Sequence, residues 1–309
     1  MQAIEVNNIK KSYEKKNALG QTDSGAGISF SVSPGELFGI IGPDGAGKTS
    51  LFRILTTLIR PDSGSATVDG FDVIKDYKEI RKRVGYMPGK FSLYPDLSVE
   101  ENLTFFATVF QTTIQENYDL IKDIYQQIEP FKHRKAGALS GGMKQKLALS
   151  CALIHKPTVL FLDEPTTGVD PVSRKEFWEM LKRLKNQGIT ILVSTPYMDE
   201  ARLCDRIALI KEGKFMDIDT PLNIIKKFDE VLWAVQSDKM YKLLTDLRSH
   251  PFVKSCFPFG EVHHITVDNK KLTTEELRTW LQQKGHNDIE IREIPASIED
   301  CYMQLALNK

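Results

Sequence analysis

The sequence predicts an α/β fold with a mainly parallel β-sheet, followed by a small α+β domain. Short apolar runs that fit buried strands alternate with stretches of helical periodicity, as in a parallel sheet covered by helices. A glycine-rich segment joins one of these strands to a helix. After about Asp219 the pattern changes to short strands and helices that carry no chemical motif.

The first elements are predicted to be strands. Residues 4–9 and 28–32 alternate apolar and polar side chains, which indicates half-buried strands. Residues 37–41 (LFGII) form a continuous apolar run, typical of a strand buried on both faces. A helix is predicted over 49–59, with Leu58 on its apolar face.

Helical patterns dominate residues 96–155. Ser98 is a candidate N-cap, and Glu101 follows at the spacing of a capping box. A further helix is predicted at 174–187 and ended by Gly188. The other predicted strands lie at 158–162, 189–193, 206–210, 231–235, 263–267 and 289–294, with two helical stretches among the last three. The predicted domains are 1–218, with a helical subdomain at about 90–157, and 219–309.

The composition disfavours several classes of protein. The 41 basic residues balance the 41 acidic residues, so the basic excess of a nucleic-acid-binding protein is missing. The four cysteines are far apart, which indicates neither a zinc site nor a disulfide framework. No run approaches about 18 apolar residues, and the N-terminus lacks a signal-peptide pattern. We therefore expect a cytoplasmic protein.

The strongest motif is residues 42–49 (GPDGAGKT), which fits G-x-x-x-x-G-K-[ST] in full. Its glycines allow backbone N–H groups to surround phosphates, and the following helix adds the positive end of its dipole. Lys48 is expected to reach the β- and γ-phosphates, and the Thr49 hydroxyl to bind Mg²⁺. A chance match in a strand–helix turn is the alternative. The predicted nucleotide-binding residues here are Gly42, Pro43, Asp44, Gly45, Ala46, Gly47, Lys48, Thr49 and Ser50.

A second motif, residues 158–164 (TVLFLDE), places two carboxylates at the end of an apolar strand. Ligands bind at this end of the strands in open α/β sheets. Asp163 is expected to hold Mg²⁺, and Glu164 to act on the water that attacks the γ-phosphate. An apolar strand that ends in Asp-Glu is common by itself. The phosphate loop elsewhere in the chain is what favours the chemical role.

A third motif, residues 139–145 (LSGGMKQ), combines a serine and two glycines with a following helix. This pattern predicts a second anion-binding helix N-terminus, with an ordinary capped helix as the alternative. A single nucleotide does not need two phosphate-binding loops from one subunit.

LSGGMKQ lies between the phosphate loop and LFLDEP, and these motifs together resemble ABC transporter ATP-binding subunits over about residues 4–218. The resemblance implies a P-loop NTPase core with an antiparallel β-subdomain and an α-helical subdomain. It implies ATP and Mg²⁺ as cofactors, held between two cassettes that pack head to tail. A membrane-spanning permease is the other implied partner, and it would hold the protein at the inner face of the cell membrane.

The resemblance also assigns residues to the interface between cassettes. Ser140, Gly141 and Gly142 would contact the γ-phosphate bound by a partner cassette, and Gln145 belongs to the same motif. The segment TTGVDP resembles the D-loop, which places Asp170 at the dimer seam.

Two further features follow from the resemblance. Tyr13 matches the aromatic residue that stacks on adenine, with a tyrosine at a strand edge as the alternative. Residues 94–106 resemble the segment that forms a groove for the coupling helix of a permease. Internal packing of the aromatic side chains in that segment is the alternative.

Two positions depart from the family pattern. Gly89 stands in GYMPG where the family usually has glutamine, and Pro196 stands in STPYMDEA where it usually has histidine. Neither residue offers a side-chain donor, and Pro196 also lacks an N–H group. We expect this chain to bind nucleotide but hydrolyse it slowly, and to complete an active site on a different cassette. A homodimer that tolerates both changes is the alternative.

The tail, with IPASIED at residues 294–300, resembles the C-terminal extension of ABC-2-type exporter ATPases, the drug-resistance and YbhF-like group. The predicted function is therefore an ATPase subunit, converting ATP and water to ADP and phosphate, that powers an exporter. One alternative is a regulatory cassette with little hydrolysis, which the two departures favour and Glu164 disfavours. Another is a non-transport ABC ATPase acting on DNA or ribosomes, which the single cassette and neutral charge disfavour.

Overall fold

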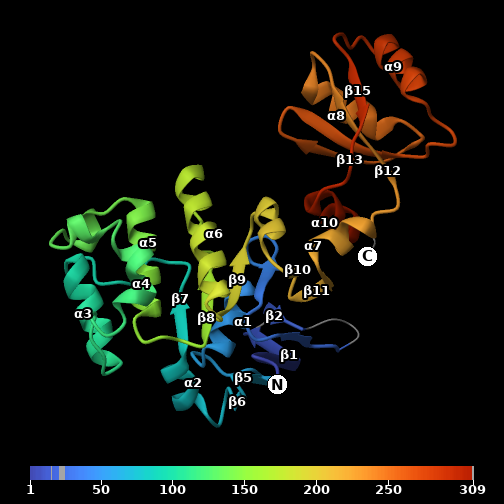
Figure 1. Ribbon diagram of the computed structural model, residues 1–309. Coiled ribbons are helices and arrows are strands. Elements are labelled where there is room, and N and C mark those ends of the chain that lie inside the picture. The colour runs from blue at the N-terminus through green and yellow to red at the C-terminus, as the bar shows by residue number, and fades with distance from the viewer. Residues whose placement is uncertain (15, 21–24, 308–309) are drawn as a thin grey trace. The chain divides into compact units, whose positions relative to one another are not determined.

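The computed structural model describes residues 1–14, 16–20 and 25–307. The chain divides into two compact units, Met1–Pro221 and Leu222–Lys309. Figure 1 shows the elements of each unit. In the described part of the chain, no helix combines the length and the apolar character needed to cross a membrane.

A mainly parallel sheet forms the centre of the first unit. Among the described residues its strand order is β11-β10-β4-β9-β8-β7, and only the pair β10–β11 is antiparallel. Every residue of β4, β8 and β9 is buried, as their apolar runs predict. The bounds are β4 Leu37–Ile41, β7 Val84–Met87, β8 Val159–Asp163, β9 Thr190–Thr195, β10 Arg206–Lys211 and β11 Lys214–Asp219.

An antiparallel sheet packs over the same core. Its described strands run in the order β2-β1-β5-β6, and β3 also pairs with β1. The helix α1 (Lys48–Leu55) shares one hydrophobic core with both sheets, and the rings of Phe52 and Phe161 meet edge to face at 6.1 Å. The strand bounds are β1 Ile4–Tyr13, β2 Lys16–Leu19, β3 Ile28–Val32, β5 Ser63–Val68 and β6 Phe71–Asp72. The helix after the glycine loop is thus fixed from two sides.

The helix α1 ends four residues earlier than the predicted limit of residue 59. Thr57 has a positive φ of 63°, which stops the helix, and Arg81 donates to its Oγ1 and carbonyl oxygen at 2.8 and 2.9 Å. Leu58 is therefore 53% exposed rather than part of the buried face. The predicted limit is wrong because apolar spacing continues beyond the point where the backbone turns.

The predicted helical region between β7 and β8 is confirmed. The Ser98–Glu101 capping box is present: Glu101 N donates to Ser98 Oγ at 3.2 Å, and Ser98 N donates to Glu101 Oε2 at 2.7 Å. The helices are α3 Val99–Val109, α4 Tyr118–Tyr125 and α5 Gly141–Leu153, with 3₁₀ turns at Glu129–Phe131 and Ala136–Ala138. Before β7 lies α2 (Tyr77–Arg83).

The helix α6 (Pro171–Asn186) begins three residues before the predicted start at 174. Asp170 caps it by accepting hydrogen bonds from Val172 N at 3.1 Å and Ser173 N at 3.0 Å, and Pro171 occupies the first turn. Gly188 has a φ of 90° just after its end, as predicted. A 3₁₀ segment at Met198–Leu203 follows β9.

The second unit is an antiparallel sheet with helices, which confirms the predicted small α+β fold. Its described strands run in the order β13-β14-β12-β15. Apolar residues of α8 and α9 pack on one face of this sheet. The elements are α7 Pro221–Lys226, β12 Val231–Gln236, α8 Met240–Ser249, β13 Val253–Phe259, β14 Val262–Val267, α9 Thr274–Gln283, β15 Glu290–Glu293 and α10 Ile298–Leu307.

Candidate functional site

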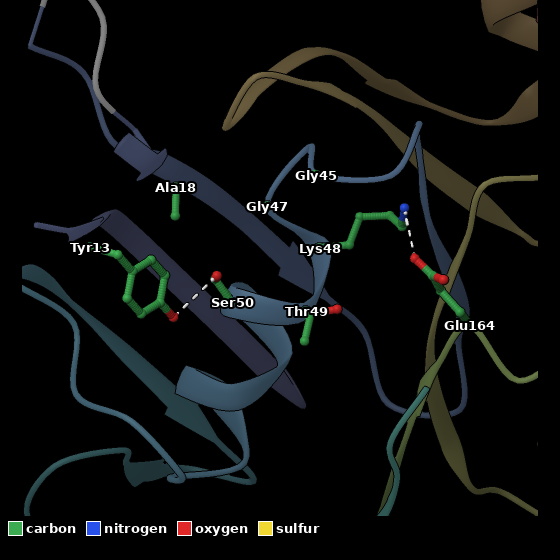
Figure 2. A pocket seen from close by; sticks show the side chains of 8 residues that line it. All are labelled: Tyr13, Ala18, Gly45, Gly47, Lys48, Thr49, Ser50 and Glu164. Atoms are coloured by element: carbon green, nitrogen blue, oxygen red, sulfur yellow. Dashed lines mark hydrogen bonds and ion pairs between the residues drawn. The ribbon is translucent and has the colours of Figure 1, made fainter. Parts of the chain in front are cut away.

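Three neighbouring strands bring the motif residues to one edge of the central sheet. The parallel strands β4, β9 and β8 lie side by side, so their carboxyl ends meet. The glycine loop leaves the end of β4, and Asp163 and Glu164 stand at the end of β8. A pocket of about 210 Å³ opens there. It is lined by Tyr13, Ala18, Gly45, Gly47, Lys48, Thr49, Ser50 and Glu164 (Figure 2).

The glycine loop is fixed by close backbone contacts. A Cβ at Gly47 would collide with the carbonyl oxygen of Ala18, and φ there is 105°. A Cβ at Gly42 would collide with the carbonyl oxygen of Ile210. Glycine is therefore required at both positions. The predicted residues Gly42, Pro43, Asp44 and Ala46 belong to this loop, although they do not line the pocket.

Lys48 and Glu164 face each other across the pocket (Figure 2). Lys48 Nζ lies 2.9 Å from Glu164 Oε1, and it donates to the carbonyl oxygens of Gly42 at 2.8 Å and Pro43 at 3.0 Å. The lysine is only 2% exposed, so its charge requires such partners. An ammonium group held in a glycine loop at a helix N-terminus provides a strong attraction for a phosphate.

Asp163 is oriented from the neighbouring strand β9. It is 1% exposed and accepts a hydrogen bond from Ser194 Oγ at 2.7 Å. The same Ser194 oxygen accepts a hydrogen bond from Glu164 N at 3.0 Å. Burial, together with the charge of Asp163, raises the pKa of Tyr86 to about 12. Ser194 thus fixes both acidic positions, and sequence reasoning missed this role because 31 residues separate the partners.

Tyr13 stands at the rim of the pocket. Its hydroxyl donates to Ser50 Oγ at 3.2 Å, while the side chain stays 43% exposed. Lys11 Nζ lies 5.7 Å from the centre of its ring. The ring is therefore anchored through its hydroxyl to Ser50, while much of its surface stays exposed (Figure 2). Ala18 also lines the pocket, and nothing in its local sequence pointed to it.

The motif LSGGMKQ at residues 139–145, here called the signature loop, lies apart from this pocket. Ser140 caps α5 by accepting a hydrogen bond from Met143 N at 3.4 Å, and a Cβ at Gly142 would lie 2.7 Å from Ser173 Oγ. The side chain of Gln145 donates to the carbonyl oxygen of Pro165. Among the described residues, the lining of the Lys48 pocket includes no member of the signature loop. A separate cavity of about 160 Å³ is lined by Gly141 and Gln145 together with Gly89 and Glu164.

The position of Gly89 is sterically tight. A Cβ there would lie 3.0 Å from the carbonyl oxygen of Asp163 and 3.8 Å from Glu164 Cβ. A glutamine at this position would therefore require a small backbone shift. The backbone at Gly89 thus packs so closely against the end of β8 that it leaves little room for a side chain.

A buried carboxylate connects the segment after β9 to α6 and the D-loop. Glu200 is 2% exposed and accepts hydrogen bonds from Thr195 Oγ1 at 2.5 Å, Thr166 Oγ1 at 3.1 Å and Arg174 Nε at 3.1 Å. The Arg174 guanidinium also lies 4.1 Å from the ring centre of Tyr197. This network fixes the segment around Pro196. Sequence reasoning missed it because Thr166 and Arg174 are 34 and 26 residues from Glu200.

Arg174→Ala is expected to lower the free energy of unfolding of the first unit by about 3 kcal/mol, because it leaves the buried Glu200 without its charge partner. Arg183→Ala is the matched control, since Arg183 and Asp123 form an exposed pair at 3.3 Å that contributes at most about 1 kcal/mol. Urea unfolding of both variants measures the difference. An equal, small loss in the two variants would contradict the role assigned to Glu200.

An apolar groove of about 530 Å³ lies between the helical region and the core of the first unit. Phe106 and Val109 of α3 line it, while Leu103 of the same helix is fully buried. The segment 94–106 therefore contributes both to internal packing and to the groove. Burial lowers the pKa of His155 in the groove wall to about 4, so its imidazole is neutral near pH 7.

A buried lysine lies in a glycine loop between a strand and a helix, and an Asp-Glu pair ends a nearby strand. This arrangement defines a P-loop nucleotide-binding protein. Residues 26–167 match the sequence model of the ABC transporter family. The chain is 38% identical over 284 residues to the probable multidrug ABC transporter ATP-binding protein YbhF of Escherichia coli (strain K12). It is 35% identical over 306 residues to the Nod factor export ATP-binding protein I of Burkholderia pseudomallei (strain K96243).

The chain belongs to the family of ABC transporter ATP-binding proteins, as the motifs predict. The alignment covers 91% of this chain and 48% of YbhF, so the chain spans about half of that relative. It covers 98% of this chain and 96% of the Burkholderia protein. The dimeric structure of MJ0796, a bacterial ABC transporter cassette, matches with 25% sequence identity and a TM-score of 0.62 over 70% of this chain and 98% of that one. This likeness confirms the predicted fold class.

Proposed function

We propose that this chain binds Mg-ATP in the Lys48 pocket and powers a membrane exporter as one of two cassettes. The observation that carries the proposal is the buried Lys48 ammonium, which lies in a glycine loop 2.9 Å from the Glu164 carboxylate. The residues present fit the nucleotide: Gly47 keeps the loop open to phosphate, Lys48 and Thr49 supply donors, and Asp163 is a buried carboxylate that suits Mg²⁺.

Each residue has a defined task in this proposal. Lys48 and the loop N–H groups bind the β- and γ-phosphates. Thr49 and Asp163 hold Mg²⁺, and Ser194 keeps the Asp163 carboxylate in place. Glu164 orients the attacking water and accepts its proton. Bound Mg-ATP supplies the phosphoanhydride bond that is broken.

Tyr13 is proposed to stack on the adenine. Its ring is partly exposed at the mouth of the pocket, and the hydrogen bond to Ser50 ties it to the helix that carries Lys48. A flat aromatic ring that is anchored at one end is suited to stack on the flat face of adenine.

A second cassette is proposed to supply the missing signature contact. Ser140 and Gly141 are exposed and lie outside the Lys48 pocket, so they are available to a nucleotide on another chain. The MJ0796 cassette, which resembles this chain in fold, is dimeric. Asp170 uses its carboxylate to cap α6, and the neighbouring Val172 is 70% exposed, as expected of a segment at a dimer seam.

We further propose that the chain's own site is degenerate and that a different cassette is its partner. Gly89 and Pro196 leave the neighbourhood of Glu164 without the usual amide and imidazole donors. The packing of Gly89 against Asp163 fits a site that has adapted to this loss. A regulatory cassette with little hydrolysis of its own is the second candidate, and the same two positions favour it.

Pro196→His is expected to raise steady-state ATP turnover by the lone chain about tenfold or more, because it restores a donor to the transition state. Pro258→His in β13 of the second unit is the control and should leave turnover unchanged. The measurement is phosphate release at saturating Mg-ATP. Brisk turnover by the unmodified lone chain that Pro196→His does not raise would contradict a degenerate site. Failure of the unmodified chain to bind Mg-ATP would contradict the whole proposal.

The permease is proposed to contact the apolar groove beside α3. The groove lies between the helical region and the core of the first unit, and its wall includes the half-exposed Leu58 and Val109. An amphipathic helix of a membrane subunit fits such a surface. The two relatives are named for multidrug transport and Nod factor export, which supports export and a place at the inner face of the cell membrane.

A further inference from the structure

The sheet of the second unit has two different faces. Trp233, Val235 and Ile265 belong to the core that packs against α8 and α9. Alternate residues on the same strands point to the opposite face, where a cavity of about 340 Å³ is bounded by the sheet and by residues of α10. Leu232 and Phe257 form apolar walls of this cavity.

The helix α10 is tied to this face by a hydrogen bond between an imidazole and a buried carboxylate. His264 Nδ1 of β14 lies 2.7 Å from Asp300 Oδ1, and the Asp300 side chain is only 3% exposed. Asp300 Oδ2 accepts hydrogen bonds from Ser297 Oγ at 2.6 Å and Ser297 N at 2.8 Å. The Asp300 carboxylate is therefore satisfied, and Met303 one turn later remains in the cavity wall.

A second carboxylate in the wall, Glu230, pairs with Lys254 but lacks a hydrogen-bond donor on one oxygen. Glu230 Oε2 is shielded from solvent and has no hydrogen-bond partner among the described residues. Lys254 Nζ forms an ion pair with this oxygen at 3.6 Å, beyond hydrogen-bond distance; the Lys254 side chain is 52% exposed and the Glu230 side chain 26%. A shielded carboxylate oxygen without a donor is unfavourable unless a ligand supplies one.

We propose that this cavity binds a small organic cation, with an apolar body against Leu232, Phe257 and Met303 and an ammonium group that donates to Glu230. Its volume falls within the range of about 300–1,000 Å³ found for small-molecule sites. Lys254 and His264 also line the cavity, but the Glu230 oxygen requires a hydrogen-bond donor, which a carboxylate ligand does not offer. This site is separate from the nucleotide pocket and does not depend on the proposed transport function.

The test uses the full chain, labelled with ¹³C at its methionine methyl groups, and three probes of similar shape. Phenethylammonium is expected to shift the Met303 methyl resonance with saturable binding, while neutral 2-phenylethanol and anionic phenylacetate bind at least about tenfold more weakly. Isothermal titration calorimetry gives the affinities independently. Met240, which packs in the core on the other face of the sheet, serves as the internal control resonance.

Two variants separate the proposal from unspecific binding. Glu230→Gln keeps the shape of the side chain and is expected to weaken phenethylammonium binding about tenfold or more, because the charge-assisted hydrogen bond is lost. Lys254→Gln removes the neighbouring positive charge and should keep or strengthen binding. The proposal is overturned if phenethylammonium leaves Met303 unshifted up to about 10 mM, if phenylacetate binds equally well, or if Glu230→Gln binds like the unmodified chain.

Discussion

Glu164→Gln is expected to reduce single-turnover ATP hydrolysis in this chain's own pocket by about 100-fold or more. The glutamine has nearly the shape of Glu164 and can still accept a hydrogen bond from Lys48, whose Nζ lies 2.9 Å from the carboxylate. It cannot take a proton from water, however, so binding should survive while the chemical step fails. The measurement is the rate of phosphate formation with protein in excess over Mg-ATP.

The matched control for this prediction is Glu179→Gln. Glu179 is an exposed residue of α6, so the same chemical change there should leave the hydrolysis rate unchanged. If Glu164→Gln hydrolysed ATP at the same rate as Glu179→Gln, another group would have to serve as the base. The proposed division of tasks at the end of β8 would then be wrong.

Gly141→Asp is expected to reduce turnover by the assembled cassette pair about 100-fold or more, through the site on the partner cassette. Within this chain, a Cβ at Gly141 meets only the carbonyl oxygen of Gly168 at 3.7 Å, which is an ordinary contact. The substitution should therefore leave folding and the chain's own Mg-ATP affinity intact. A carboxylate in the signature loop would instead repel the γ-phosphate held by the other cassette.

Gly141→Ala is the control for that experiment, because it adds a Cβ at the same position as the aspartate does but adds no charge. We expect it to reduce turnover far less than the aspartate. The comparison requires the pair of cassettes rather than the lone chain. Equal rates for both variants, or a loss of Mg-ATP binding by the lone Gly141→Asp chain, would show that the signature loop does not act across a dimer interface.

The parts of the fold that could be predicted from sequence are those with a strong local pattern. The strand β4 and the part of β8 before Asp163 are continuous apolar runs, and the capping box at Ser98 predicts the start of α3. Weaker patterns were missed. The strand β5 is exposed over its first three residues, and β7 contains Gly85, where a Cβ would collide with the carbonyl oxygen of Ala152. Long-range packing, rather than local sequence, makes these two segments strands.

The same distinction holds for the candidate site. The glycine loop and the Asp-Glu pair are local motifs, so Lys48 and Glu164 could be named before the structure placed them together. Ser194 and Glu200 were not assigned roles, because their partners are brought to them only by the order of β8 and β9 and the position of α6. That one oxygen of Glu230 has no hydrogen-bond partner among the described residues can likewise be seen only in the folded structure.

The most direct measurement is a titration of the purified chain with Mg-ATP, compared with Lys48→Ala. The unmodified chain should bind, and Lys48→Ala should weaken binding about tenfold or more, because a charge-assisted hydrogen bond to phosphate is lost. Lys182→Ala, which changes an exposed lysine of α6, should bind like the unmodified chain. No measurable affinity in the unmodified chain, or the same affinity after Lys48→Ala, would contradict the account.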